Sequence, residues 1–193
     1  MLIKDAFEEV FTGLNMSNSV NDEKSTNEAY FIQKDSIQYT NIIEKKLIKK
    51  TITTDVNHKF YMKDRDIIVS LKKPYKVGTY RFNNLKPIII PNNFVVLRGI
   101  NRDLYSFIFV ANYLQKIGLA NFSKKSTLAT KDLTASDIKS ISLPDIPKEE
   151  QMKISELMNL INDRSAIYST ILENDDEIIK YALNQVVGDN SDS

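Results

Sequence analysis

The chain has 193 residues, of which 42 % are hydrophobic and 26 % are charged, so it can hold one ordinary domain with an appendage. It contains no cysteine, which excludes disulfides and thiolate metal sites and favours a reducing compartment. No apolar run approaches the roughly 20 residues that span a bilayer, and the acidic N-terminal segment is untypical of a signal peptide, so we expect a cytoplasmic protein without a membrane segment.

The net charge of +1 conceals an uneven distribution along the chain. Residues 1–44 carry 3 basic and 8 acidic side chains, whereas residues 45–86 carry 12 basic and 3 acidic ones. Residues 87–143 carry 7 and 3, and residues 144–193 carry 4 and 11. A basic middle between acidic ends is typical of a surface that binds a polyanion such as nucleic acid, although lysines on the solvent face of a sheet would give the same count.

The first hundred residues predict one short helix followed by short strands. Apolar residues recur at helical spacing over residues 2–11, which predicts an amphipathic helix that Gly13 ends. Segments rich in β-branched or aromatic residues predict strands at residues 29–33, 66–71, 86–90 and 94–98. Asparagines at residues 83–84 and 92–93 predict turns beside them.

The next segment predicts a packed helix over residues 101–118 that Gly118 ends. Its apolar stripe consists of Leu104, Phe107, Ile108, Ala111, Leu114 and Ile117. Polar residues 121–136 predict a loop, and the apolar stretch 138–143 predicts a short strand. These elements together predict a compact α+β domain over residues 1–143 with mixed short strands and helices.

A long helix is predicted after Pro144 and Pro147, within a second segment that covers residues 144–187, and residues 188–193 are expected to be disordered. At about 1.5 Å per residue, the helix would be about 60 Å long. With Ile154 as heptad position a, seven of the ten a and d positions are apolar. We therefore expect a coiled-coil-like helix that packs on a second helix. The residues expected to face this partner are Ile154, Leu157, Ile161, Tyr168, Ile171, Ile178 and Ala182.

Sequence signals for catalysis are scarce. His58 is the only histidine, and the five glycines form neither a dinucleotide-binding fingerprint nor a phosphate loop. Asp64 and Asp66 with His58 could in principle hold a metal ion for nuclease chemistry, but turn formation explains the two aspartates more simply. We expect no catalytic residue, no metal and no cofactor.

Two basic segments are better candidates for binding. Residues 70–82 ("SLKKPYKVGTYRF") interleave lysines and an arginine with aromatic residues, which suits contacts to phosphates and base edges. Residues 123–127 ("SKKST") add hydroxyl donors to two lysines. An ordinary hairpin and an ordinary solvated loop are the alternative interpretations.

Three segments together resemble the specificity subunits of type I restriction-modification systems. They are residues 2–13 ("LIKDAFEEVFTG"), residues 60–78 ("FYMKDRDIIVSLKKPYKVG") and residues 138–161 ("IKSISLPDIPKEEQMKISELMNLI"). The last segment is the most specific. In it a predicted strand is followed by two spaced prolines, and Glu150–Gln151 then open the helix. Arg65 stands where the family usually has glycine before Asp66.

The resemblance implies a half-length, non-catalytic specificity subunit with one target-recognition domain and one spacer helix. Such a subunit recognises a half-site of a bipartite target in double-stranded DNA. Its spacer helix packs antiparallel on a second spacer helix, from another copy of the chain or from a different half-subunit, and it presents a surface to a methyltransferase subunit. We expect DNA contacts from Lys45, Lys46, Lys49, Lys50, Lys72, Lys73, Tyr75, Lys76, Tyr80, Arg81, Lys124, Lys125, Ser126 and Thr127.

A second interpretation is a protein-interaction module or decoy that binds the methyltransferase through its long helix without reading DNA. Salt-sensitive DNA binding would distinguish the two, because phosphate contacts release counterions. The metal-dependent nuclease is the third and least favoured interpretation.

Overall fold

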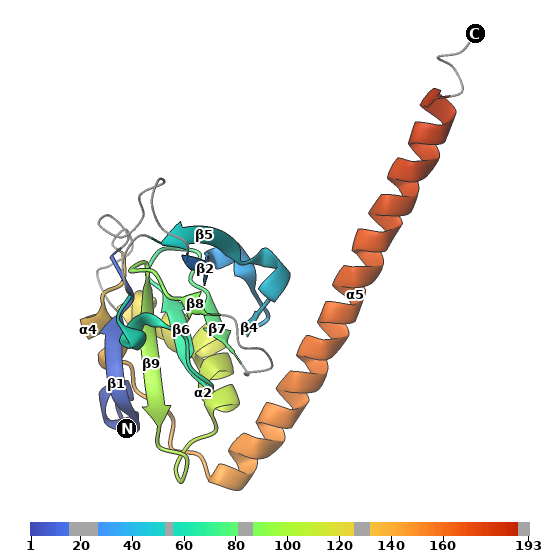
Figure 1. Ribbon diagram of the computed structural model, residues 1–193. Coiled ribbons are helices and arrows are strands. Elements are labelled where there is room, and N and C mark those ends of the chain that lie inside the picture. Colours follow the sequence, from blue (N-terminus) through green and yellow to red (C-terminus); the bar gives the residue numbers. More distant parts are fainter. Residues whose placement is uncertain (16–26, 53–55, 81–86, 126–131, 189–193) are drawn as a thin grey trace. The chain divides into compact units, whose positions relative to one another are not determined.

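The computed structural model describes residues 1–15, 27–52, 56–80, 87–125 and 132–188 (Figure 1). The chain divides into two compact units, Met1–Ser155 and Glu156–Ser193. The first unit contains two sheets and several short helices, and the second is helical. No helix within the described ranges is long and apolar enough to cross a membrane.

The larger sheet of the first unit has six strands in the order β1-β9-β6-β7-β4-β3. Its strands are β1 (Phe7–Thr12), β3 (Ile37–Gln38), β4 (Asn41–Ile42), β6 (Ile67–Ser70), β7 (Val77–Thr79) and β9 (Phe94–Ile100). The pairing is antiparallel except between β4 and β7. The smaller sheet has the order β5-β2-β8 and consists of β2 (Asn27–Phe31), β5 (Ile48–Ile52) and β8 (Ile88–Ile89).

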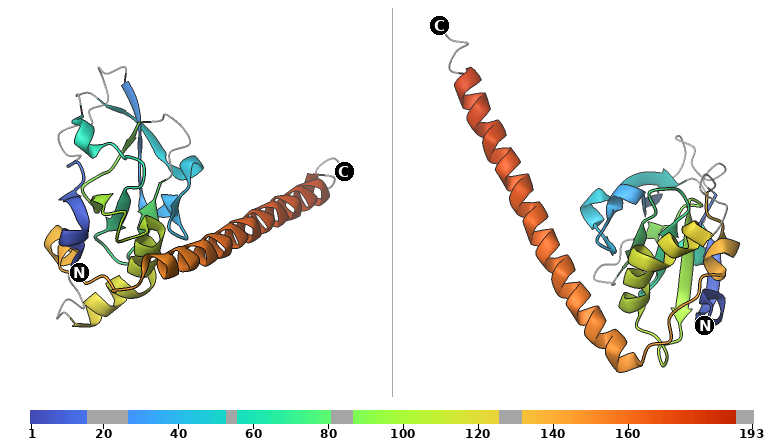
Figure 2. Two further views of the ribbon diagram at one scale, coloured as in Figure 1. Left: turned by 90° about the horizontal axis from the view of Figure 1, so that it is seen from below. Right: turned by 180° about the vertical axis from the view of Figure 1, so that it is seen from behind.

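Helices cover one face of the six-stranded sheet, as the view from behind in Figure 2 shows. They are α1 (Ile3–Ala6), α2 (Phe107–Tyr113), a π-helical turn η5 (Leu114–Gly118), α3 (Leu119–Lys125) and α4 (Ala135–Lys139). Within the described ranges, 3-10 turns lie between strands at η2 (Lys34–Ser36), η3 (Glu44–Lys46) and η4 (His58–Phe60).

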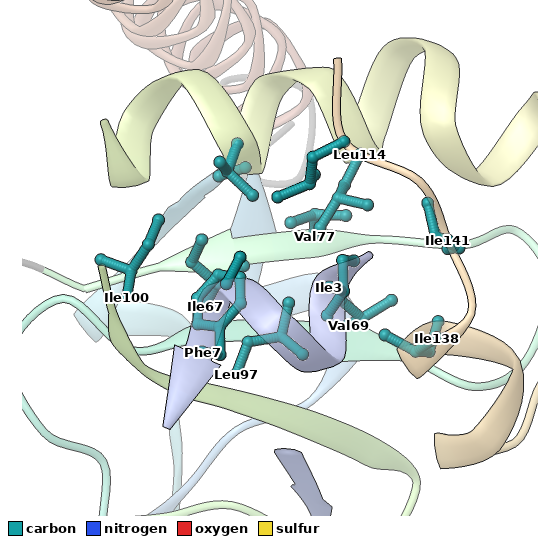
Figure 3. Close-up of a cluster of buried hydrophobic side chains, with 14 of the residues drawn as sticks. Ile3, Phe7, Ile67, Val69, Val77, Leu97, Ile100, Leu114, Ile138 and Ile141 are labelled. Carbon is teal, nitrogen blue, oxygen red and sulfur yellow. The ribbon is translucent and has the colours of Figure 1, made fainter. Parts of the chain in front are cut away.

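The central strands are buried on both faces, which explains their nearly continuous apolar sequences. In β6, Ile67 and Val69 point into the cluster under the helices, drawn in Figure 3, whereas Ile68 belongs to a second cluster. This second cluster also contains Ile88 of the smaller sheet, so it joins the two sheets. The strands predicted at residues 29–33, 66–71, 86–90 and 94–98 are confirmed as β2, β6, β8 and β9.

The helix predicted over residues 2–11 is wrong beyond its first turn. Helix α1 ends at Ala6, and the chain continues as β1, in which Phe7 pairs with Ile100 of β9. Pairing with a long central strand outweighs the helical spacing of the apolar residues. Gly13 does not end a helix, but it permits a close approach of backbones, since a Cβ there would contact the carbonyl oxygens of Ile90 and Pro91.

The helix predicted over residues 101–118 begins later and continues further than expected. Ser106 caps its start by accepting a hydrogen bond from the Phe109 N–H (3.5 Å), so Leu104 lies outside the helix and is exposed. Gly118 is buried within the π-helical turn, and the next large buried side chain after Leu114 is Leu119, five residues later, so the turn shifts the buried face. Gly118 therefore does not stop the chain of helices, and Ile117 points to solvent.

The loop and strand predicted over residues 121–143 are also partly wrong. Helix α3 extends to Lys125, and α4 begins after a capping box in which Thr134 and Asp137 exchange hydrogen bonds. The predicted strand over residues 138–143 reduces to an isolated bridge between Ser142 and Leu2.

The long helix is confirmed as α5 (Lys148–Gly188), and its start is tied to the first unit by Gln151. This side chain is fully buried, and its amide donates to the carbonyls of Leu104 (2.9 Å) and Ile146 (2.8 Å). Its oxygen accepts from the Ser106 N–H (3.0 Å). One glutamine thus satisfies backbone groups of two loops at the point where the helix begins.

We expect Gln151→Ala to lower the free energy of unfolding of the first unit by about 2–4 kcal/mol, because several backbone groups lose their partners. The matched control is Met152→Ala, the next residue, whose side chain is exposed and which should change stability by less than about 0.5 kcal/mol. Urea titration followed by circular dichroism measures both. Equal effects of the two substitutions would show that Gln151 has no special part in the junction.

Candidate nucleic-acid interface

The segment that carries Lys45 and Lys46 is held in place by the contact between η2 and η3. The Lys46 carbonyl accepts hydrogen bonds from the Ser36 hydroxyl (2.8 Å) and the Gln33 amide (3.4 Å). The Ile43 N–H donates to the Ser36 carbonyl (2.7 Å). Ser36 is fully buried, so its hydrogen bonds fix the backbone of this segment. The side chain of Lys45 is exposed.

Lys34 connects this segment to the basic residues 70–82. Its Nζ donates to the carbonyl of Lys73 (2.9 Å), which lies 39 residues later in the chain. Lys34 belongs to η2, the same turn that holds the Lys46 carbonyl. Lys34 therefore connects the turn that carries Lys45 and Lys46 with the loop that carries Lys73. Lys34 was not among the predicted residues, because nothing in its local sequence distinguishes it from a surface lysine.

Strand β5 carries two further lysines at the edge of the three-stranded sheet. It pairs only with β2 within the described residues, and its first four residues are exposed. Lys49 forms an ion pair with Glu28 (2.6 Å), and this carboxylate raises the pKa of Lys49. Lys50 extends from the opposite face of the strand, since neighbouring strand residues alternate.

The loop between β6 and β7 presents Lys72 and Lys73 on a well-anchored backbone. The buried Ser70 hydroxyl accepts from the Lys76 N–H (2.8 Å), which closes the loop at its base. Gln115 of the helical layer bonds the other side of the loop, accepting from the Val77 N–H (2.7 Å) and donating to the Tyr75 carbonyl (3.2 Å). A loop fixed at both ends can place cationic side chains reproducibly toward a ligand.

The predicted residues of this loop differ in exposure and in partners. Lys72 and Lys73 are exposed, whereas Tyr75 and Lys76 are half-buried. The Lys72 ammonium lies 4.0 Å from the Asp132 carboxylate, and the Lys73 ammonium lies 6.0 Å from the centre of the Tyr75 ring. The Lys72 side chain remains 69 % exposed despite its ion pair.

Tyr80 does not lie on this surface. Its side chain is 4 % exposed, and its hydroxyl donates to the Glu44 carboxylate (2.6 Å). Burial, followed by the bond to Glu44, raises the pKa of Tyr80 to about 12. A contact with DNA is inconsistent with this position, because the ring would have to leave the core; the residue instead ties β7 to η3.

The side chains of five other predicted contacts cannot be placed. Arg81, Ser126 and Thr127 lie outside the described residues. Lys124 and Lys125 belong to the last turn of α3, but their side chains also lie outside the described part.

The carboxylate considered for metal binding is occupied by an arginine. Asp66 is 1 % exposed and accepts two hydrogen bonds from Arg98 of β9, at 2.9 and 2.6 Å. Arg98 also donates to the carbonyls of Lys59 (3.0 Å) and Tyr61 (2.9 Å). Burial raises the pKa of Asp66, while Arg98 and the Lys63 N–H act in the opposite direction.

Asp66 is therefore a structural residue and not a free ligand. Among the described residues, no group of three or more histidine, aspartate or glutamate side chains could hold a metal ion. Arg65, which precedes it, has a φ of 63°, in the left-handed region that glycine adopts most readily. The glycine of the similar family would fit this turn without strain, and here an arginine takes the same backbone conformation.

The second unit carries a strongly apolar helix surface. Of the residues predicted to face a partner, Leu157, Ile161, Tyr168, Ile171, Ile178 and Ala182 are all exposed. Ile154 is an exception and corrects that prediction, because it packs against the core cluster of the first unit. The apolar face available on α5 thus begins at Leu157.

No protein-family profile matches the chain, and no curated protein matches it in sequence. The solved structures do give a likeness. The α+β body of two sheets with a helical layer and the long helix that follows it are similar to known structures from restriction-modification systems. The HsdS subunit from Thermoanaerobacter tengcongensis superposes with a TM-score of 0.60 at 15 % identity, over 96 % of this chain and 48 % of that one.

A second similar structure comes from a study of complex assembly and conformational transition in a type I R-M system. It superposes with a TM-score of 0.57 at 16 % identity, over 87 % of this chain and 39 % of that one. The chain thus spans less than half the length of either structure. At these identities the likeness establishes the fold, and the expected fold class is confirmed.

We expect Tyr80→Phe to change how stability depends on alkaline pH. The folded protein holds the Tyr80 proton up to about pH 12, whereas an unfolded tyrosine loses it near pH 10. The stabilisation is therefore complete below about pH 10 and is lost as the pH rises to about 12. The Phe variant should be about 1 kcal/mol less stable at neutral pH and should lack this part of the alkaline loss.

Urea unfolding at neutral pH and at about pH 11 measures the effect. Tyr39→Phe serves as the control, because Tyr39 is exposed and should keep the alkaline loss of the unmodified protein. If Tyr80→Phe and the unmodified protein lost stability in parallel above pH 10, the bond to Glu44 would not be responsible.

Proposed function

We propose that this chain is a non-catalytic DNA-specificity subunit that recognises one half-site of a bipartite target and recruits methyltransferase subunits. The likeness to HsdS carries the proposal, since it extends over 96 % of this chain and includes both the body and the long helix. The body would read the half-site, and α5 would provide the surface for other subunits.

The charges of the first unit support the DNA-reading part of the proposal. Lys34 and Lys73 are joined by a hydrogen bond, and the turn that carries Lys34 also holds the segment with Lys45. These links between segments that are distant in the sequence support a basic surface that could follow a phosphate backbone. Phosphate contacts of this kind would position the body, and neighbouring side chains would read base edges.

The helix supports the recruiting part. Its apolar residues from Leu157 to Val187 are exposed, and an apolar stripe on a single helix is stable in water only when a partner covers it. A second copy of the chain, or a different half-subunit, would cover part of this surface, and a methyltransferase subunit would contact the assembled helices.

A protein-interaction module or decoy is the second candidate. The ion pairs of Lys49 with Glu28 and of Lys72 with Asp132 favour it to some extent, because they neutralise two of the expected phosphate contacts. Such a protein would keep the helix contacts and would bind DNA weakly, with little dependence on salt.

We expect the combined substitution of Lys45, Lys50 and Lys73 by alanine to weaken binding to a mixed-sequence DNA duplex by at least about tenfold at low salt. The dependence of the logarithm of affinity on the logarithm of salt concentration should become shallower by about 0.9 for each phosphate contact removed. Fluorescence anisotropy over a series of salt concentrations measures both quantities.

The matched control replaces Lys4, Lys116 and Lys139. These lysines are exposed and lie outside residues 45–50 and 70–82. This control removes the same charge, so it separates a local contact from a general effect of net charge. Equal losses in the two variants, or no loss in either, would count against DNA binding by this surface.

In the source organism, we expect removal of the gene to abolish N6-methyladenine at a split motif of two short half-sites. Sequencing that detects the modified base, with and without the gene, makes the measurement. Restoration by the unmodified gene and not by the Lys45/Lys50/Lys73 variant would connect the motif to the basic surface. An unchanged methylation pattern would favour the interaction module.

A further inference from the structure

We infer that α5 pairs with α5 of a second copy of this chain in one antiparallel register, in which Arg164 of each copy faces Asp175 of the other. The inference rests on the self-pairing included in the proposed function, and it adds the register and the residues that select the partner.

The inference starts from two charged residues on the apolar face of the second unit. In the heptad that places Ile161 and Tyr168 at position a, Arg164 occupies position d and Asp175 occupies position a. Both side chains are exposed, and neither forms an ion pair within the part of the chain that the structure describes. Arg164 and Asp175 are thus one cation and one anion among the apolar a and d positions of α5.

A parallel pair of identical helices does not suit these charges. In a parallel pair in register, each core residue faces the same residue of the other helix. Arg164 would then face Arg164 and Asp175 would face Asp175, at a distance where like charges repel and with little water to screen them.

An antiparallel pair can satisfy both charges at once. In such a pair each a position lies beside a d position of the other helix. Because the two helices run in opposite directions, the residue numbers of any two facing residues add to the same sum. Setting Arg164 opposite Asp175 therefore determines every other layer. The remaining core layers pair Leu157 with Ala182, Ile161 with Ile178, and Tyr168 with Ile171.

All the other layers of this register are apolar, and two-fold symmetry makes each layer occur twice. The symmetry axis passes between Tyr168 and Ile171. The contact extends from residue 157 to residue 182, which is about 37 Å of helix. Every one of these residues belongs to the second unit, so the pairing does not require the Ile154 side chain, which packs in the first unit.

Registers displaced by one heptad lose the charge match. In one direction Arg164 would face Tyr168 and Asp175 would face Leu157. In the other direction Arg164 would face Ala182 and Asp175 would face Ile171. Each displacement leaves buried charges without partners, which is strongly unfavourable. Pairing the two charges offsets part of their desolvation cost, so the matched register is favoured over the displaced ones.

Disulfide trapping tests the register directly, because the chain has no cysteine of its own. We expect that Ile161→Cys and Ile178→Cys chains, mixed in equal amounts and oxidised, form covalent dimers between unlike chains. Neither variant should form them alone, since the two copies of residue 161 would be about 25 Å apart along the antiparallel pair.

The control pair is Ala166→Cys with Glu173→Cys. These residues lie at the same height in the proposed register, but at heptad position f, on the side away from the partner. They should not form a disulfide. Efficient dimers of either core variant alone would demonstrate a parallel pair and would overturn the inference.

Charge exchange gives a second and independent measurement. We expect Arg164→Asp and Asp175→Arg each to weaken self-association at least about tenfold, because each creates two pairs of like charges. The double variant should regain the affinity of the unmodified chain, since both ion pairs return with reversed polarity. Analytical ultracentrifugation over a concentration series provides the dissociation constants.

The outcomes separate the register from the proposed function. If the unmodified chain self-associates but the mixed cysteine variants do not join, the register is overturned and self-pairing stands. If the unmodified chain remains monomeric at high concentration, self-pairing itself fails, and with it this inference. The DNA-reading proposal is tested separately by the lysine variants.

Discussion

The buried ion pair between Asp66 and Arg98 is the constraint on which the body of this protein depends. Arg98 lies on β9, the strand that joins β1 to β6, and its guanidinium reaches the turn before β6 and two carbonyls around η4. Both carboxylate oxygens and all three guanidinium nitrogens have partners, so neither charge is left unpaired in the interior. The same bonds hold β6 where it begins, and β6 leads directly into the loop that presents Lys72 and Lys73. Asp66, which the sequence offered as a possible metal ligand, thus stabilises the strand that leads to the candidate DNA surface.

Most of the strands could be predicted from the sequence, because β6 and β9 are buried on both faces and their apolar runs are short and β-branched. The N-terminal helix could not, since the spacing of residues 2–11 suits a helix while the fold requires an edge strand that pairs with β9. The sequence also did not show which residues of the helical layer are buried after Leu114. One π-helical turn at Leu114–Gly118 moves the buried face to Leu119, and no residue pattern within a uniform helix shows such a shift.

The candidate site was predictable in composition and not in arrangement. Charge counting identifies the basic segments, but the bond from Lys34 to the Lys73 carbonyl, which brings two of them together, depends on tertiary structure. Aromatic residues beside lysines suggested base contacts, yet Tyr80, which directly follows β7, has its side chain buried in the second core cluster. Gln151 shows the opposite case. Its place in a family-like motif marked it as important, and the structure gives the reason, because its amide closes the junction at which α5 begins.

Arg164 and Asp175 on α5 give this helix a way to select its partner. An uninterrupted apolar stripe would accept many helices in many registers, and it would also favour nonspecific association. Arg164 and Asp175 restrict that choice, since a partner must offer an acid and a base at matching heights along an antiparallel helix. A second copy of the chain meets the condition by symmetry. A different half-subunit would have to carry the same pair at the same separation of 11 positions (from 164 to 175), so the spacing of two residues sets which chains can share a partner helix.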